Sequence, residues 1–401
     1  MSSSLPLEND AKDDEMAQDN DIAMHGNHKT TSRPRSRIAK NVHGFAPIWF
    51  TWCMNSGILG ILTHQSPYQF RGLKVISTIF YLFDLACFVI FSGIFIMRFV
   101  VYRSEAYNAL ISNQTNIMFC ACWPIAWMTL TTLTSLICSS ASWGQHAFTM
   151  VAFVMWWIAV LWCLIILFWA FGVMFEQHKA GKERIPMGII LPAVSVSTAA
   201  ITGALVVSES YGMSSRLAVP IIVVSYMLVG MGTLLGLILT TYLFHGYLSY
   251  GWPPPAQTAT VFIFIGPMGQ GSAALQELGR AARMFFGEYG KGTFLQIESA
   301  SAIQAMSDVL ALMLTGLGFI WVGFGVYAMI RQAVRRKLAW NHSWNSIIFP
   351  TGTLVTSVSL FSVGLDSPAL RVIETIMLIL LIIVFLVNLT FIVKRLSQGK
   401  M

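Results

Sequence analysis

The chain carries apolar runs of about 20 residues, separated by short polar breaks, along nearly its whole length. A helix of that length is what crossing the hydrocarbon core of a bilayer requires. Ten runs can be placed, at residues 45–63, 74–97, 117–137, 148–174, 186–207, 218–243, 258–279, 301–330, 345–364 and 369–393. The sequence therefore predicts an all-α polytopic membrane protein with ten transmembrane helices.

Charge is scarce outside the N-terminal tail. The first 40 residues hold 13 of the 43 charged side chains, so the remaining 361 residues carry only 30, about one in twelve. Soluble domains carry roughly one in four. This composition excludes a soluble enzyme, a nucleic-acid binder and a disordered scaffold. The partner that it implies is the lipid bilayer.

The basic residues predict the orientation of the chain. With ten spans both termini lie on one side, and from Arg33 onward sixteen Lys and Arg residues fall on that side against seven in the opposite loops. Loops rich in Lys and Arg stay in the cytoplasm, so we expect both termini to be cytoplasmic. The sequons at Asn113, Asn341 and Asn388 would then carry no glycan.

Residues 1–40 differ in composition from the rest, since an acidic stretch is followed by a basic one. We expect a disordered cytoplasmic tail ahead of a transmembrane domain at residues 41–400. The tail is either a plain solvated segment or a regulatory arm. The second alternative uses Thr30, Thr31, Ser32 and Ser36, whose phosphorylation would weaken attraction to the anionic inner leaflet.

The cysteines and histidines form no metal-binding pattern. The six Cys lie in or beside the spans, and the eight His lie in the tail or near span ends, with no H-E-x-x-H spacing. The chain also lacks the phosphate-binding loop G-x-x-x-x-G-K-[ST]. We predict no enzyme activity, no metal, no cofactor and no direct use of ATP.

Prolines alternate along the series of spans. Each odd span has one inside its apolar run, at Pro47, Pro124, Pro192, Pro267 and Pro350. A proline kinks a helix, and in lipid the freed backbone groups need neighbouring helices or a water-filled cavity. We therefore expect kinked odd helices in an inner ring around a path, with even helices outside. The alternative is chance, because prolines are common in membrane helices.

The seventh span contains the run Gly266-Pro267-Met268-Gly269-Gln270-Gly271. Three glycines and a proline in six residues favour an unwound stretch, whose exposed amides would suit an anion. The alternative is close packing of helices at small residues. Together with Asn55 and Ser195 on other odd spans, Gly266, Gly269, Gln270 and Gly271 are the predicted substrate pathway.

Four acids lie within or at the ends of spans: Asp84, Glu277, Asp308 and Glu374. None has a basic residue three or four positions later within the predicted limits of its span. A charge at the centre of a bilayer costs about 2.5 to 3.5 kcal/mol, so each acid needs a partner or a purpose. Asp84 and Asp308 are candidates for proton coupling, and the alternative is a hydrogen-bonded acid that ties helices together.

Three motifs resemble a known family. These are Phe45-Ala46-Pro47-Ile48-Trp49-Phe50 with Asn55-Ser56-Gly57, the run at 266–271, and Phe349-Pro350-Thr351-Gly352. They are similar to the tellurite-resistance/dicarboxylate transporter family, which includes plant slow anion channels, yeast malate permeases and fungal sulfite efflux pumps. The resemblance covers residues 41–400 and is strongest to the sulfite pumps.

The resemblance implies five helical hairpins around a pseudo-fivefold central pore. It also implies that Phe349, just before the proline of the ninth helix, plugs the pore, and that the protein is a homo-oligomer. The implied function is export of sulfite or bisulfite across the plasma membrane, giving sulfite tolerance. Alternatives on the same fold are a malate or dicarboxylate transporter and a general anion channel, and a receptor is a further alternative.

Overall fold

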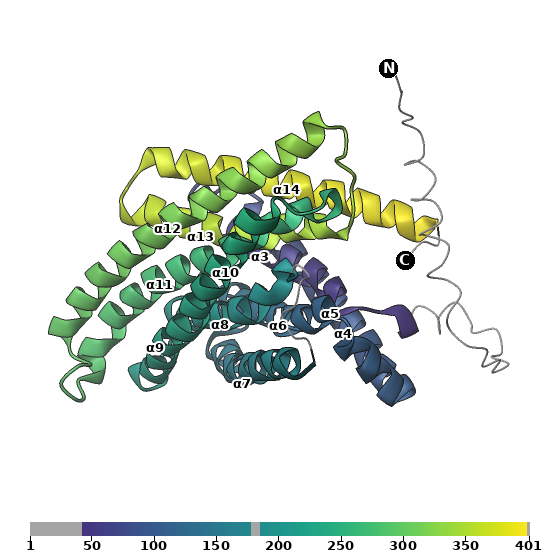
Figure 1. Cartoon of the computed structure of the whole chain (residues 1–401). Helices are drawn as coiled ribbons and strands as arrows, with labels where there is room; N and C mark the ends of the chain where they lie inside the picture. The colour runs from purple at the N-terminus through teal and green to yellow at the C-terminus, as the bar shows by residue number, and fades with distance from the viewer. Residues whose placement is uncertain (1–41, 178–184, 399–401) are drawn as a thin grey trace, which may run out of the picture. The chain divides into compact units, whose positions relative to one another are not determined.

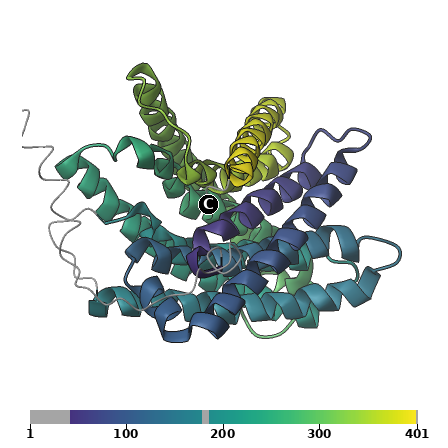
Figure 2. The same cartoon turned by 90° about the vertical axis from the view of Figure 1, so that its right-hand side faces the viewer.

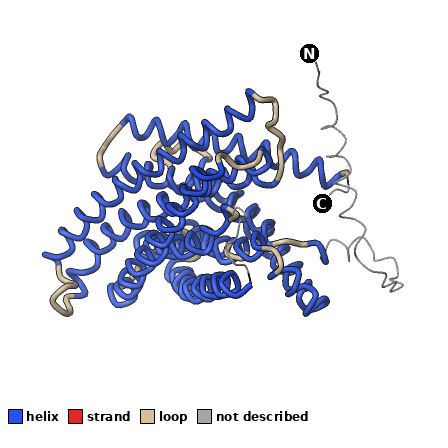
Figure 3. Tube along the Cα trace, in the orientation of Figure 1, coloured by secondary structure: helices blue, strands red, loops and turns tan. Residues whose placement is uncertain are grey.

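The computed structural model describes residues 42–177 and 185–398. These residues form helices joined by loops, without a strand among them, as Figures 1 and 3 show. The predicted all-α class is confirmed. The predicted tail, with Thr30, Thr31, Ser32 and Ser36, lies outside the described residues.

Eight helices in the described part of the chain are long and apolar enough to cross a membrane. Two of the ten expected spans fall outside this criterion, the short α3 (Phe50–Gln65) and the less apolar α11 (Ile265–Tyr289). The polytopic architecture is therefore confirmed, whereas the count of ten spans stays a prediction.

The helices form five antiparallel hairpins, each made of one inner and one outer helix (Figures 1 and 2). The inner helices are α3, α6 (Cys122–Leu133), α8 (Leu191–Glu209), α11 and α13 (Ile348–Gly364). Their outer partners are α4 (Leu73–Ile111), α7 (Gln145–Gln177), α9 (Ser215–Val229) with α10 (Leu235–Tyr250), α12 (Ile297–Val334) and α14 (Pro368–Ser397). Contacts from α3 to α6, α8, α11, α13 and back to α3 close a ring.

Burial separates the two sets of helices. The apolar window of the α8 segment, Met187–Glu209, is completely buried, whereas only 22% of the α4 window is buried. Apolar side chains on the outer helices face outward, as lipid requires, and the inner helices are covered on all sides. The expected inner ring and outer belt are thus present.

The prolines mark junctions within the inner segments. Pro47 begins the short 3₁₀ segment η2 (Pro47–Trp49), directly before α3. The other four lie within the first three residues of α6, α8, α11 and α13: Pro124, Pro192, Pro267 and Pro350. Each of these helices follows a short helical segment: α5 (Gln114–Phe119), η4 (Met187–Ile190), η6 (Pro255–Phe264) and η7 (His342–Ile347). The inner segments are thus irregular at their prolines, as expected, and the irregularity is a junction between two helical segments in a first turn that tolerates proline.

The prediction of an unwound stretch at 266–271 is wrong. Helix α11 runs unbroken from Ile265 to Tyr289 and includes all three glycines. A Cβ on Gly269 would lie 2.2 Å from Thr353 Oγ1 and 2.6 Å from the Leu354 amide nitrogen of α13. The glycines bring α11 close to its neighbours, and packing outweighs the helix cost of about 1 kcal/mol for each glycine.

The residues between the predicted seventh and eighth spans, 280–300, are mostly helical. Helix α11 continues to Tyr289 and α12 begins at Ile297, so the connection is short (Figure 1). Arg280 therefore lies one turn after Glu277 on the same helix, with 3.0 Å between Nη2 and Oε2. The expectation that Glu277 lacks a basic partner is wrong, because the helix extends beyond the apolar run.

The contact between α11 and α13 predicts the effect of adding one methyl group. Gly269→Ala should lower the free energy of unfolding by about 1 to 3 kcal/mol, because the new Cβ overlaps backbone and side chain of α13. The matched control is Gly316→Ala on the outer helix α12, where nothing lies within 4 Å of the new Cβ. Thermal unfolding of the purified protein in detergent measures the difference. Equal midpoints for the two variants would contradict this account of the packing.

Candidate permeation pathway

A small cavity lies at the centre of the ring. Its volume is about 20 Å³, and all five inner helices contribute to its wall. That volume has room for about one water molecule. The lining residues are Ile58 and Ile61 of α3, Met128, Thr129 and Thr132 of α6, Thr198, Ile201, Thr202 and Leu205 of α8, Gln270 of α11, and Phe349 and Thr356 of α13.

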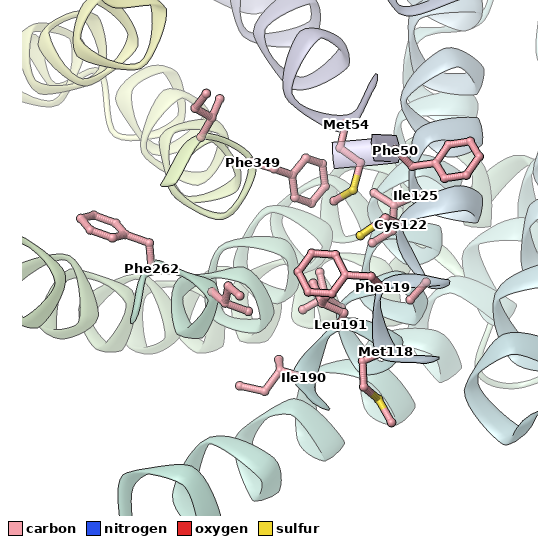
Figure 4. Packing of buried hydrophobic residues seen from close by; sticks show 14 of the residues in the cluster. Phe50, Met54, Met118, Phe119, Cys122, Ile125, Ile190, Leu191, Phe262 and Phe349 are labelled. Carbon is pink, nitrogen blue, oxygen red and sulfur yellow. The ribbon is translucent and has the colours of Figure 1, made fainter. Parts of the chain in front are cut away.

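Phe349 separates this central cavity from a second one of about 20 Å³, because its side chain lines both. The second cavity lies at the beginnings of the inner segments. Besides Phe349, its wall includes Met54, Phe119 and Leu191. Figure 4 shows Phe349 pointing toward Met54 and Phe119. Phe349 is only 3% exposed, so no open channel passes its ring in this conformation.

A wide mouth of about 450 Å³ lies at the other end, where the inner helices finish. Thr356 lines both this mouth and the central cavity. The three cavities therefore follow one another along the axis of the ring. The mouth contains charged and polar side chains, namely His64, Gln65, Glu209, Gln276, Glu277, Arg280, Gln304, Asp308, Thr356 and Ser359.

The narrow part of this row is uncharged, and its walls are mostly apolar. Neither small cavity has a Lys, Arg, Asp or Glu side chain in its wall. The polar residues in the wall of the central cavity are five threonines and Gln270, whose amide donates to Thr198 Oγ1 at 3.0 Å. Hydroxyl and amide groups can donate hydrogen bonds to an anion without holding it as a fixed cation would.

Asn55 connects the first and last inner helices. Its Oδ1 accepts from the Phe349 amide at 3.1 Å, and its Nδ2 donates to the Asn345 carbonyl at 3.1 Å. The Phe349 amide stands in the first turn of α13, directly after η7. Asn55 thereby fixes the backbone that carries Phe349.

The predicted pathway residues fall into two groups. Asn55, Gln270 and Phe349 line the cavities, so the structure brings these three together. Gly266 packs against Val194, and a Cβ on Gly271 would meet Thr233 of the outer segment η5 (Gly230–Leu234). Ser195 is fully buried, and the part of the chain described here offers its hydroxyl no partner. Neither Ser195 nor the three glycines line the two small cavities, and the glycines pack against neighbouring helices.

The two candidates for proton coupling lie at different depths. Asp308 of α12 lines the wide mouth. Asp84 of α4 is completely buried, and its Oδ2 lies at hydrogen-bond distance, 2.9 Å, from Thr129 Oγ1. Glu374 of α14 is also buried, and its Oε2 accepts from Thr375 at 3.1 Å. Of these acids only Asp84 touches the wall of the central cavity.

Several lining residues were missed from the sequence, notably Phe119, Thr132, Thr202 and Thr356. A signal for some of them exists. Thr129 and Thr132 are three residues apart, and Thr198 and Thr202 are four apart, which puts each pair on one face of a helix. Hydroxyls repeated at helical spacing in otherwise apolar spans would have indicated that face. Phe119 has no comparable signal among 27 Phe residues.

Comparison with known proteins supplies the family. The profile of the SLAC1 family, described as "Voltage-dependent anion channel", matches residues 44–393. The sulfite efflux pump SSU1 of Arthroderma benhamiae is 26% identical over 334 residues, covering 83% of this chain and 86% of the pump. SSU1 of Saccharomyces cerevisiae is 21% identical over 359 residues, covering 77% of each chain. A putative malic acid transport protein of Schizosaccharomyces pombe is 20% identical over 358 residues, covering 88% of this chain and 80% of that protein. The match to nearly the whole helical unit means that this chain belongs to the SLAC1 family of voltage-dependent anion channels.

Proposed function

We propose that this protein exports sulfite or bisulfite from the cytoplasm through the ring of inner helices. The observation that carries the proposal is the row of three cavities closed by Phe349, whose narrow part offers neutral hydrogen-bond donors and no fixed charge. The sulfite efflux pumps among its relatives support the choice of substrate. The same features support a transporter rather than an enzyme.

The membrane potential supplies enough energy for export. A cytosol negative by 100 mV drives a monovalent anion outward with about 2.3 kcal/mol, which corresponds to roughly a 50-fold concentration ratio. A pore that conducts bisulfite therefore needs neither ATP nor a second ion. The donors in the central cavity replace part of the anion's hydration shell during passage.

We propose that Phe349 is the gate and that Asn55 holds it in place. The ring of Phe349 stands between the two small cavities, so its displacement would join them. Asn55 bonds the amide of the same residue, which makes the gate a side chain on a fixed stretch of backbone.

The proposed orientation follows from the basic residues. Both termini lie in the cytoplasm, which places the wide mouth at the ends of the inner helices on the outer side of the plasma membrane. The apolar outer belt faces lipid and, in the homo-oligomer that we propose, other copies of the chain.

A second candidate is malate transport, because two malic acid transport proteins are also relatives. This candidate would use Asp84 or Asp308 to couple the flux to protons. The uncharged narrow part favours sulfite, since a dicarboxylate with two charges benefits more from a fixed cation.

The two candidates predict different ion fluxes from proteoliposomes. We expect sulfite efflux to follow an imposed membrane potential, to exceed malate efflux, and to ignore a pH gradient at zero potential. The measurement uses vesicles loaded in parallel with sulfite, malate, nitrate or chloride. Nitrate flux equal to sulfite flux would make the protein a general anion channel. Malate flux that requires the pH gradient would replace the sulfite pore by a proton-coupled carrier.

Removing the proposed gate should open the path. Phe349→Ala should raise anion flux severalfold and reduce the preference for sulfite over chloride, because the two small cavities would merge. The matched control is Phe262→Ala, which truncates a buried phenylalanine of η6 that packs on Gly325 of α12 and lines neither small cavity. In Figure 4 the Phe262 ring lies apart from Phe349, Met54 and Phe119. Equal fluxes in the two variants would reject Phe349 as the gate.

Asn55 offers a separate test of gate positioning. Asn55→Ala leaves the buried Phe349 amide without an acceptor, which costs about 1 to 3 kcal/mol, and should raise the flux of the resting protein. Asn55→Asp keeps an acceptor at this position and adds a negative charge beside the path. It should keep the gate closed and lower the maximal anion flux. Single-vesicle flux and thermal midpoints of both variants check this pair, and a leak of the same size in both would contradict the assigned role.

A further inference from the structure

Asp84 reaches the wall of the central cavity from an outer helix. It belongs to α4, yet its side chain passes between α3 and α6 and bonds Thr129. Space for this comes from Gly57 of α3, where an added Cβ would lie 2.6 Å from Asp84 Oδ2 and 2.3 Å from Thr129 Cβ. The acid therefore bonds a residue whose other atoms line the central cavity.

The hydrogen bonds around Thr129 indicate where the protons lie. Thr129 Oγ1 is 2.9 Å from Asp84 Oδ2 and 2.8 Å from the Ala126 carbonyl oxygen. The hydroxyl has one hydrogen, and the Ala126 carbonyl can only accept. With an ionised Asp84, two acceptors compete for that hydrogen. With a protonated Asp84, the acid donates to Thr129 and Thr129 donates to Ala126, so both short contacts are hydrogen bonds.

The surroundings of Asp84 favour the neutral acid as well. Its side chain is fully buried, its Oδ1 has no hydrogen-bond partner, and no ion pair to it occurs within residues 42–177 and 185–398. The titratable groups nearest to it are Cys53 of α3, and Cys87 and Tyr81 of its own helix, none of them cationic. A carboxylate buried without a compensating charge is strongly disfavoured.

We infer that Asp84 is a positioning residue that acts through Thr129 and selects anions with oxygen acceptors. As a neutral acid it donates to Thr129 Oγ1, which leaves the Thr129 hydrogen to turn from Ala126 to an anion in the central cavity. The inference rests on the proposed function, because it assigns a role at the same path. It differs from proton coupling in that the acid keeps its proton throughout the passage.

The chain of two donors explains why an outer helix contributes an acid to a neutral path. A hydroxyl that accepts a hydrogen bond becomes a stronger donor, because bonds in such a chain polarise one another. The directed bond suits the lone pair of an oxyanion more than a spherical halide. Thr129 should therefore contribute to the preference for sulfite over chloride.

The test measures sulfite, malate and chloride flux in proteoliposomes at fixed potential, from pH 5 to pH 8. Asp84→Asn keeps a donor and Thr129→Ser keeps a hydroxyl, so both should retain the flux ratio of sulfite to chloride. Asp84→Ala and Thr129→Val should each lower this ratio about fivefold, as expected for one lost hydrogen bond. The combination of Asp84→Ala with Thr129→Val should lower the flux ratio no more than either single variant does. The matched control is Glu374→Ala, which removes a buried acid of α14 that lines neither small cavity, and should leave the ratio unchanged.

Three results would overturn the inference. If Asp84→Asn loses as much sulfite flux as Asp84→Ala, the carboxyl acts by gaining and losing a proton. If sulfite and chloride fluxes fall together in Asp84→Ala, Asp84 has a purely structural role. If the losses of the flux ratio multiply when Asp84→Ala and Thr129→Val are combined, Asp84 does not act through Thr129. The fluxes of sulfite and malate through the wild-type protein test the proposed function independently of these variants. If it conducts malate instead of sulfite, the same variants test the pair with malate as the oxyanion, and an unchanged malate to chloride ratio in Asp84→Ala rejects it.

Discussion

Lipid offers no partner for a backbone amide or a polar side chain, and this constraint organises the whole molecule. Hydroxyl, amide and carboxyl groups of the inner helices must find each other inside the ring. Ser272 of α11 shows the result, since its hydroxyl lies 2.8 Å from Thr315 of α12 and 2.7 Å from Ser357 of α13. Polar groups joined across three helices hold the hairpins in register, and lipid contacts only the outer belt.

The same constraint explains why the inner segments begin irregularly. A 3₁₀ or short helical segment followed by an α-helix exposes amides at the junction, and these junctions lie around the second cavity. Non-helical backbone at this depth is tolerated because protein surrounds it. The junction at Phe349 is the clearest case, since Asn55 satisfies the amide that the helix start leaves open.

Much of this architecture could be predicted from the sequence, whereas the partners of individual residues could not. Prolines in every second span predicted which helices lie inside, because their backbone needs protein neighbours. The glycines of α11 were misjudged, since local composition favours unwinding and the decisive contact comes from Thr353, more than 80 residues away. The relation of Asp84 to Thr129 was likewise invisible, because it depends on Gly57 in a third helix. The length of the apolar run also predicted too early an end for α11, because the helix continues past that run with Arg280 paired to Glu277.

The hydrogen bonds from Asn55 to the fifth hairpin have a consequence for biosynthesis. Asn55 and its partners Asn345 and Phe349 are separated by 290 and 294 residues. During insertion the first hairpins must therefore wait in the bilayer with one side of α3 uncovered, until the fifth hairpin arrives. Phe349, the proposed gate, arrives with that same hairpin. A partly synthesised chain thus has no closed ring through which ions could leak, and the ring and the proposed gate form in a single step.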